Sequence, residues 1–158
     1  MSNIFSAAEV VEMGIKIEEN GKSFYDTVAK KSKNKNAQQA FELLAGEEEN
    51  HIKRFEAILS QVKKYEPPEA YTEDYFSYIK SLSSEYVFTS KDKGEETAKD
   101  AKTDKEAVEL GIGFEKQSIL FYEEMKKFVL EGEQKVVDKL LEEEKEHLRK
   151  LSDLVGQV

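Results

Sequence analysis

Residues 44–51 read LAGEEENH, and residues 140–147, 96 positions later, read LLEEEKEH. Each stretch ends in a histidine that follows a glutamate by three residues, His51 after Glu48 and His147 after Glu144. Residues three apart on a helix lie on the same face. Each stretch therefore presents a carboxylate and an imidazole side by side.

The repetition extends upstream of both stretches. Residues 14–18 read GIKIE and residues 111–115 read GIGFE, and each copy reaches a Phe-Tyr pair seven residues after its glutamate. Ser6 and Thr103, also equivalent, each precede a glutamate by three residues, which is the pattern of a helix capping box. The chain is therefore an internal duplication whose two copies begin with the same helix-start signal.

Each copy is predicted to be a helical hairpin. We expect helices over 7–31, 37–64, 104–129 and 134–156, with turns at 33–36 and 131–133. The connection over 65–103 opens with two prolines, carries an aromatic patch within 71–88 that we interpret as a lid or an oligomer contact, and ends in charged sequence. Two hairpins joined by one long connection form a ferritin-like bundle. We therefore expect one all-α domain over 1–158, a four-helix bundle of two hairpins (7–64 and 104–156) joined by a long crossover.

Composition excludes several classes of protein. The formal net charge is −9, and the basic run over 30–35 is best explained as a solvated turn, so a nucleic-acid interface is not expected. The absence of cysteine excludes disulfides, zinc ribbons and iron–sulfur centres within this sequence. No apolar run approaches the roughly 18 residues of a membrane span, and the N-terminus lacks a signal-peptide pattern. We expect a cytoplasmic protein that does not bind membranes.

The apolar stripe of each predicted helix carries ionisable side chains at its middle. Buried and unpaired carboxylates are costly, whereas two divalent ions would neutralise four of them and two histidines would add neutral nitrogen ligands. The sequence therefore predicts a two-metal site built from Glu18, Glu48, His51, Glu115, Glu144 and His147.

The heights of these residues agree with that prediction. In an antiparallel hairpin, residues equidistant from the turn lie at the same level. The sequence midpoint between Glu18 and His51 falls within the first predicted turn, and the midpoint between Glu115 and His147 falls at the edge of the second. Glu47 and Glu143 also precede the histidines, by four residues, but the stripe spacing favours Glu48 and Glu144. We expect the flanking small residues to leave room for metals and a small ligand: Gly14, Gly21, Gly111 and Ser118.

One glutamate from each of two helices, plus Glu-x-x-His from each of the other two, is a di-metal carboxylate pattern of helix bundles. With this pattern the chain resembles the rubrerythrin-like branch of the ferritin-like di-iron proteins over both hairpins. The resemblance implies a non-haem centre of two iron ions, with bridging and terminal glutamates, that reduces peroxide or dioxygen in oxidant defence. It also favours Tyr25 and Tyr122 as hydrogen-bond donors to ligand carboxylates rather than plain core residues.

The sequence departs from rubrerythrins in two respects. It lacks the four cysteines of their rubredoxin-like module, so electrons would come from a separate donor protein. It also has Ile112 and Ser118 one turn either side of Glu115, where those proteins place a further glutamate.

Several alternatives stay open at this point. One is a ferroxidase or iron-storage protein of bacterioferritin type, although neither Glu-x-x-His segment has a methionine to bind haem. Another is a metal-free helical interaction module. Manganese or zinc could replace iron, and a homodimer or small homo-oligomer, domain-swapped or not, is expected.

Overall fold

The computed structural model describes residues 7–64, 74, 77–79, 81 and 90–158, and this part of the chain contains helices and no strand. Most of the aromatic patch within 71–88 lies outside the described residues. The helices are α1 (Ala7–Lys31), α2 (Lys35–Lys64), α4 (Lys93–Asp100), α5 (Asp104–Met125) and α6 (Glu131–Leu154), with short 3-10 helices η2 (Lys126–Phe128) and η3 (Val155–Gln157). None of the described helices is both long and apolar enough to cross a membrane.

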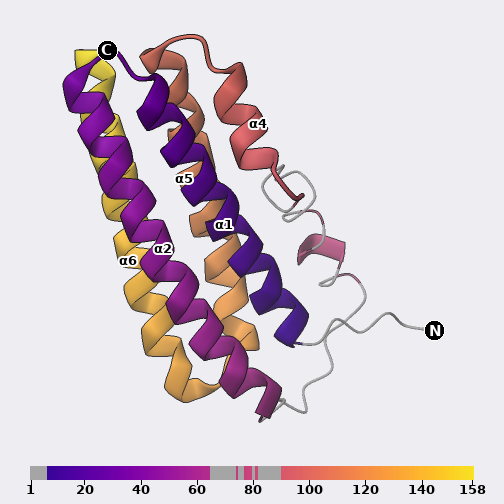
Figure 1. The fold of residues 1–158 in the computed structure, drawn as a ribbon. Helices are drawn as coiled ribbons and strands as arrows, with labels where there is room; N and C mark the ends of the chain where they lie inside the picture. Colours follow the sequence, from indigo (N-terminus) through magenta and orange to yellow (C-terminus); the bar gives the residue numbers. More distant parts are fainter. Residues whose placement is uncertain (1–6, 65–73, 75–76, 80, 82–89) are drawn as a thin grey trace.

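The four long helices form the expected all-α bundle. Figure 1 shows α1 and α2 as one antiparallel hairpin and α5 and α6 as the other, and the hairpins pack through α1 against α5 and α2 against α6. The interior is filled by aliphatic and aromatic side chains above and below a polar middle layer, among them Val11, Phe41, Phe55, Met125, Leu140 and Leu151. The periodic apolar stripes read from the sequence therefore face one another across the core.

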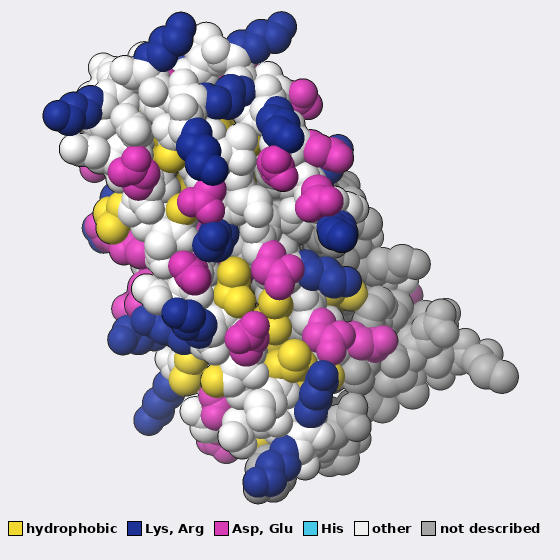
Figure 2. Space-filling view, in the orientation of Figure 1, with side chains coloured by type: hydrophobic (Ala, Val, Ile, Leu, Met, Phe, Trp, Pro, Cys, Tyr) yellow, Lys and Arg dark blue, Asp and Glu magenta, His cyan; other side chains and the backbone are white. Residues whose placement is uncertain are grey.

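Charged side chains of both signs are interspersed over the face that Figure 2 shows. The two histidines do not reach the surface, since each is only 1% exposed. The polar groups in the middle layer are therefore part of the core.

Several predicted helix ends needed correction, and α5 ends at Met125 rather than at 129, with the 3-10 helix η2 after it. Helix α2 begins two residues earlier than predicted, because the Asn34 side chain accepts a hydrogen bond from the backbone N–H of Ala37 at 3.0 Å and caps the helix. The predicted turn over 131–133 is wrong, because these residues form the first turn of α6. The chain reverses earlier, where Phe128 and Val129 are buried against the core.

One of the two capping boxes lies within the described residues. The Thr103 hydroxyl accepts a hydrogen bond from the backbone N–H of Glu106 at 3.1 Å, as predicted for the start of α5. The Glu106 side chain accepts from the backbone N–H of Lys102 at 2.8 Å. The equivalent box at Ser6 lies outside the described residues.

Helix α4 is an element that the sequence reading missed. It has two glutamates in its first turn and Lys99 in its last, an order that suits the helix dipole and could have revealed it. It lies along α1, which holds it at both ends (Figure 1). The Asn20 side chain accepts from the backbone N–H of Gly94 at 2.9 Å, and Lys31 Nζ donates to the carbonyls of Ala98, Lys99 and Ala101 at 2.9, 2.8 and 2.5 Å.

The close approach of α4 to α1 yields a prediction. A Cβ atom at Gly94 would lie 2.0 Å from the backbone oxygen of Asn20, so Gly94→Ala must displace α4. We expect it to lower the free energy of unfolding by about 1–3 kcal/mol and to speed amide exchange over 93–100. Gly46→Ala is the matched control, because nothing lies within 4 Å of a Cβ there and alanine favours a helix. Equal behaviour of the two variants would contradict this account of the α1–α4 contact.

Candidate di-metal centre

The middle of the bundle brings together all six side chains that the sequence placed in one layer. Helix α1 contributes one glutamate, α5 another, and α2 and α6 each a Glu-x-x-His pair. None of the six is more than 1% exposed. They are Glu18, Glu48, His51, Glu115, Glu144 and His147.

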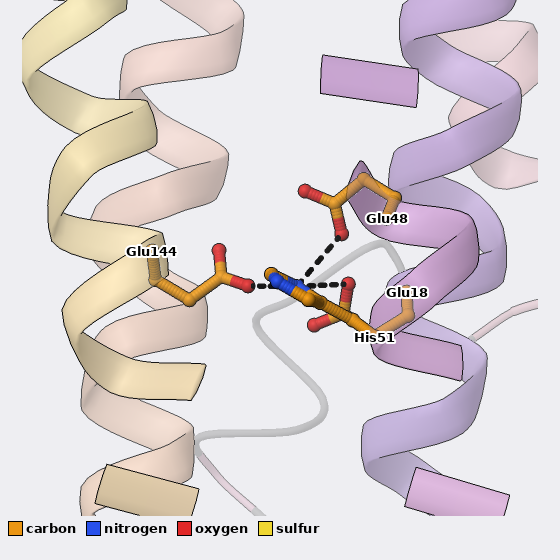
Figure 3. A group of neighbouring side chains, drawn as sticks. All are labelled: Glu18, Glu48, His51 and Glu144. Atoms are coloured by element: carbon orange, nitrogen blue, oxygen red, sulfur yellow. Dashed lines mark ion pairs between the residues drawn. The ribbon is translucent and has the colours of Figure 1, made fainter. Parts of the chain in front are cut away.

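The first group of candidate ligands surrounds the Nδ1 atom of His51 (Figure 3). This nitrogen lies 2.7 Å from Glu144 Oε1, 3.4 Å from Glu18 Oε2 and 3.9 Å from Glu48 Oε2. One ligand atom from each of these four residues lies within 4.8 Å of the others. Three carboxylates and one imidazole thus converge on a space that suits one ion.

The second group is related to the first by the duplication. His147 Nδ1 lies 3.3 Å from Glu48 Oε1, 3.6 Å from Glu115 Oε1 and 3.7 Å from Glu144 Oε2. The same 4.8 Å limit holds for this group. Glu48 and Glu144 belong to both groups and offer one oxygen to each. Their positions are those of two ligands shared between two adjacent ions.

The inward atoms of the cluster have no suitable hydrogen-bond partner among the described residues. They are Glu18 Oε2, Glu115 Oε2, both carboxylate oxygens of Glu48 and Glu144, and Nδ1 of His51 and His147. Buried polar atoms are nearly always satisfied in folded proteins, and a set of unsatisfied acceptors that converge calls for cations. Oxygen and imidazole nitrogen are ligands that iron, manganese and zinc accept. The residues present therefore fit a pair of divalent ions.

Both tyrosines identified from the sequence touch this layer. The Tyr25 hydroxyl donates to Glu115 Oε1 at 2.5 Å, and the Tyr122 hydroxyl donates to Glu18 Oε1. Each bond crosses from one hairpin to the other. Burial, followed by the charge of the bonded glutamate, raises the pKa of each phenol well above its usual value. Both phenols therefore remain neutral donors at physiological pH.

Glu47 and Glu143 lie on the outer side of the histidines. Glu143 Oε2 on α6 is 2.8 Å from Nε2 of His51, and Glu47 Oε2 on α2 is 2.8 Å from Nε2 of His147. Glu48 and Glu144, the members of each adjacent pair that the stripe spacing favours, are the two that face the cluster. The Nδ1 atoms face the centre while the Nε2 atoms face these outer carboxylates.

Two basic residues that the sequence reading missed contact the outer carboxylates. Arg54 NH1 lies 2.7 Å from Glu143 Oε2, and Lys150 Nζ lies 3.4 Å from Glu47 Oε2. Each follows a histidine of its own helix by three residues, a spacing that could have identified them. Both carboxylates have a lowered pKa: in Glu47 mainly through its close contact with Nε2 of His147, and in Glu143 because its bonds to Arg54 and His51 outweigh burial.

Without metal, the protonation of the clustered side chains depends on their burial and on the charges of their neighbours. Burial, with the charges of Glu18 and Glu115, raises the pKa of Glu144 well above its usual value. Burial alone would lower the pKa of the histidines, but the neighbouring carboxylates outweigh it. The pKa of His51 is raised, and that of His147 is raised to about 9. The cluster thus holds protons that divalent ions would displace.

The small residues make room for aromatic rings. A Cβ atom at Gly21 would lie 2.6 Å from the Phe114 ring and 3.4 Å from Glu48 Oε2. A Cβ at Gly14 would lie 3.6 Å from Tyr122, and one at Gly111 would lie 3.5 Å from Tyr25. At these three glycines the structure places neighbouring side chains close by rather than open space for a ligand, and the Phe114 ring is the nearest of them at Gly21.

Known proteins share these features. The family model described as Rubrerythrin matches residues 9–155. A search of curated proteins finds no significant match. A solved structure from Thermotoga maritima, assigned as a ferritin-like diiron-carboxylate protein, is 23% identical, covers 99% of this chain and 98% of its own, and has a TM-score of 0.69. The two proteins therefore share a fold over nearly the whole length of both chains. The matched region includes the buried cluster and nearly all of the four long helices, and the chain belongs to the rubrerythrin family.

Proposed function

We propose that this protein is a di-iron oxidoreductase that reduces hydrogen peroxide or dioxygen in oxidant defence, in the cytoplasm, with electrons from a separate donor protein. The observation that carries the proposal is the converging set of buried carboxylate and imidazole atoms without hydrogen-bond partners among the described residues. Membership of the rubrerythrin family supports iron as the metal.

The ligand roles follow from the two overlapping groups. Glu18 and His51 would hold one ion and Glu115 and His147 the other, while Glu48 and Glu144 would bind both. Four carboxylates balance the charge of two divalent ions, which removes the repulsion that raises the pKa of Glu144.

The chemistry that a diferrous pair supplies is two electrons, the number that, with two protons, reduces one hydrogen peroxide molecule to two of water. The chain's own residues confine and orient this reaction. The Phe114 ring lies against Gly21, beside the buried cluster, which favours a small oxidant over a bulky substrate. The neutral hydroxyls of Tyr25 and Tyr122 each donate to one oxygen of Glu115 and Glu18, and the other oxygen of each carboxylate has no hydrogen-bond partner among the described residues.

A second candidate, a ferroxidase or iron-storage protein, is favoured by one observation. The two ligand groups are matched in composition, three glutamates and one histidine each, and Ile112 and Ser118 flank Glu115 without adding a carboxylate. Size-exclusion chromatography of the iron-loaded protein separates the candidates. A homodimer or other small oligomer with two irons per chain supports the oxidoreductase, whereas a large assembly with many irons per chain supports storage.

Replacing Glu18 and Glu115, the glutamates that would each bind a single ion, should prevent metal binding at the site. After anaerobic loading with ferrous iron and desalting, we expect about two irons per chain in the unaltered protein, because two ligand groups are present, and fewer than one in Glu18→Ala/Glu115→Ala. Elemental analysis measures both. The control Glu19→Ala/Glu109→Ala removes the same charge from exposed positions of the same helices and should keep the full metal content. Full occupancy of the ligand variant would refute the proposed site.

The tyrosine hydroxyls should support the site through specific partners. We expect Tyr25→Phe to lower the free energy of unfolding of the metal-free protein by about 1–3 kcal/mol, because Glu115 Oε1 loses its buried donor. Denaturant unfolding measures this. Combined with Glu115→Gln, the substitution should be clearly non-additive, whereas combined with Glu18→Gln it should be closer to additive. Equal coupling to both glutamates would contradict a specific hydrogen bond from Tyr25 to Glu115.

Metal affinity should rise with pH. Ligation needs neutral imidazole, and the pKa of His147 in the metal-free protein is about 9, so below this pH binding must displace a proton. The raised pKa values of His51 and Glu144 act in the same direction. We expect the affinity for Mn²⁺ to rise by about tenfold per pH unit for each displaced proton, and the contribution of His147 to level off above pH 9. Calorimetry from pH 6.5 to 9 tests this, and an affinity constant across that range would contradict it.

A further inference from the structure

The outer nitrogen of each histidine is held from the opposite hairpin. Glu143 reaches from α6 and is hydrogen-bonded to Nε2 of His51 at 2.8 Å, whereas Glu47 reaches from α2 and forms an ion pair with Nε2 of His147 at 2.8 Å, outside hydrogen-bond geometry. The residue that follows each of them in sequence points its carboxylate into the cluster. Helices α2 and α6 thus use adjacent glutamates for opposite sides of the same layer.

Each outer carboxylate has a basic neighbour, and the two neighbours differ. Arg54 NH1 lies 2.7 Å from Glu143 Oε2, within the range of a charge-assisted hydrogen bond. Lys150 Nζ lies 3.4 and 3.5 Å from the two oxygens of Glu47, where mainly charge attraction remains. All four side chains are about one-third exposed. The site therefore has two His–Glu–cation chains of unequal strength.

We propose that Glu143 with Arg54, and Glu47 with Lys150, are positioning pairs that each control one of the two metal positions, and that the Arg54 pair exerts the stronger control. This inference rests on the proposed di-metal site. Glu143 with Arg54 acts on the ion that His51 would bind, and Glu47 with Lys150 acts on the ion that His147 would bind.

The physical reason lies in the imidazole. A carboxylate that accepts the Nε2–H of a histidine fixes the tautomer in which Nδ1 is free to bind a metal, and fixes the plane of the ring. Both Nδ1 atoms point at the cluster, as this requires. A guanidinium holds a carboxylate in a defined orientation, whereas an ammonium on a flexible stem acts as a point charge. Glu143 is therefore held more firmly than Glu47.

The competing explanation is that these are ordinary surface ion pairs. Exposed pairs contribute little to stability, and their loss would leave metal binding unchanged. The positions of the carboxylates argue against this, because each also touches a histidine that is only 1% exposed.

The test is a Co²⁺ titration of the full chain, followed by calorimetry and by the visible absorption of the bound ion, which reports its ligand geometry. We expect two binding steps in the unaltered protein. Glu143→Leu should weaken one step by about 10- to 100-fold and Glu47→Leu the other. Glu143→Gln should be milder, because its amide oxygen still accepts the Nε2–H. Arg54→Met should weaken the step that depends on Glu143, and by more than Lys150→Met weakens the other step.

The neighbouring exposed residue supplies a control, Glu142→Gln, which should leave both steps and the spectrum unchanged. If Glu143→Leu disturbs folding, Glu143→Gln and Arg54→Met decide, because they keep the buried ligands. Two normal steps in the Glu143 and Glu47 variants, or equal loss of both steps in each, would overturn this inference while the proposed function stands. A chain that binds no Co²⁺, Mn²⁺ or iron at the cluster would overturn both.

Discussion

The structure depends on one constraint, which is that four carboxylates and two imidazoles lie in the middle of an apolar helix bundle. Such groups are strongly disfavoured in a dry interior unless they are paired or bound to metal. The rest of the bundle is arranged around them. Apolar layers close the core above and below, all four long helices bring a carboxylate to the same height, and every one of the six side chains is almost fully buried. A core of this kind is less stable without metal than an apolar core, and the protein gains stability when cations bind to it.

The two hairpins complete each other at this layer. Tyr25 of the first hairpin donates to Glu115 of the second, and Tyr122 of the second donates to Glu18 of the first. The outer carboxylates cross in the same way, Glu143 to His51 and Glu47 to His147. Neither hairpin alone can hold a ligand set in place. Assembly of the bundle and organisation of the centre are therefore the same event.

The two halves of the duplication differ in ways that bear on the site and on the packing around it. An arginine supports one outer carboxylate and a lysine the other, so the two metal positions have unequal surroundings. Helix α4 lies against α1, where Asn20 and Lys31 bond to it, and this contact belongs to the first half. These asymmetries, rather than the shared ligand set, are where this chain departs from a symmetric di-metal bundle.

The sequence by itself determined the helical class, the duplication and the layer of six ionisable residues. Helical periodicity can be seen in a short stretch of sequence, and the side chains able to bind a metal follow from the residue types alone. The sequence also indicated which residues of the two helices in a hairpin lie at the same level, because that level can be counted from the turn. It did not determine helix α4, whose docking depends on a backbone contact between Asn20 and Gly94, nor the turn before α6, which burial of Phe128 and Val129 displaced. Only the tertiary structure decided what the outer glutamates, Glu47 and Glu143, contact, which in each case is the histidine of the opposite hairpin. Spacing along a helix fixes the direction of each residue, about 100° from that of its neighbour, whereas the partner of an outward carboxylate depends on the helix that packs beside it.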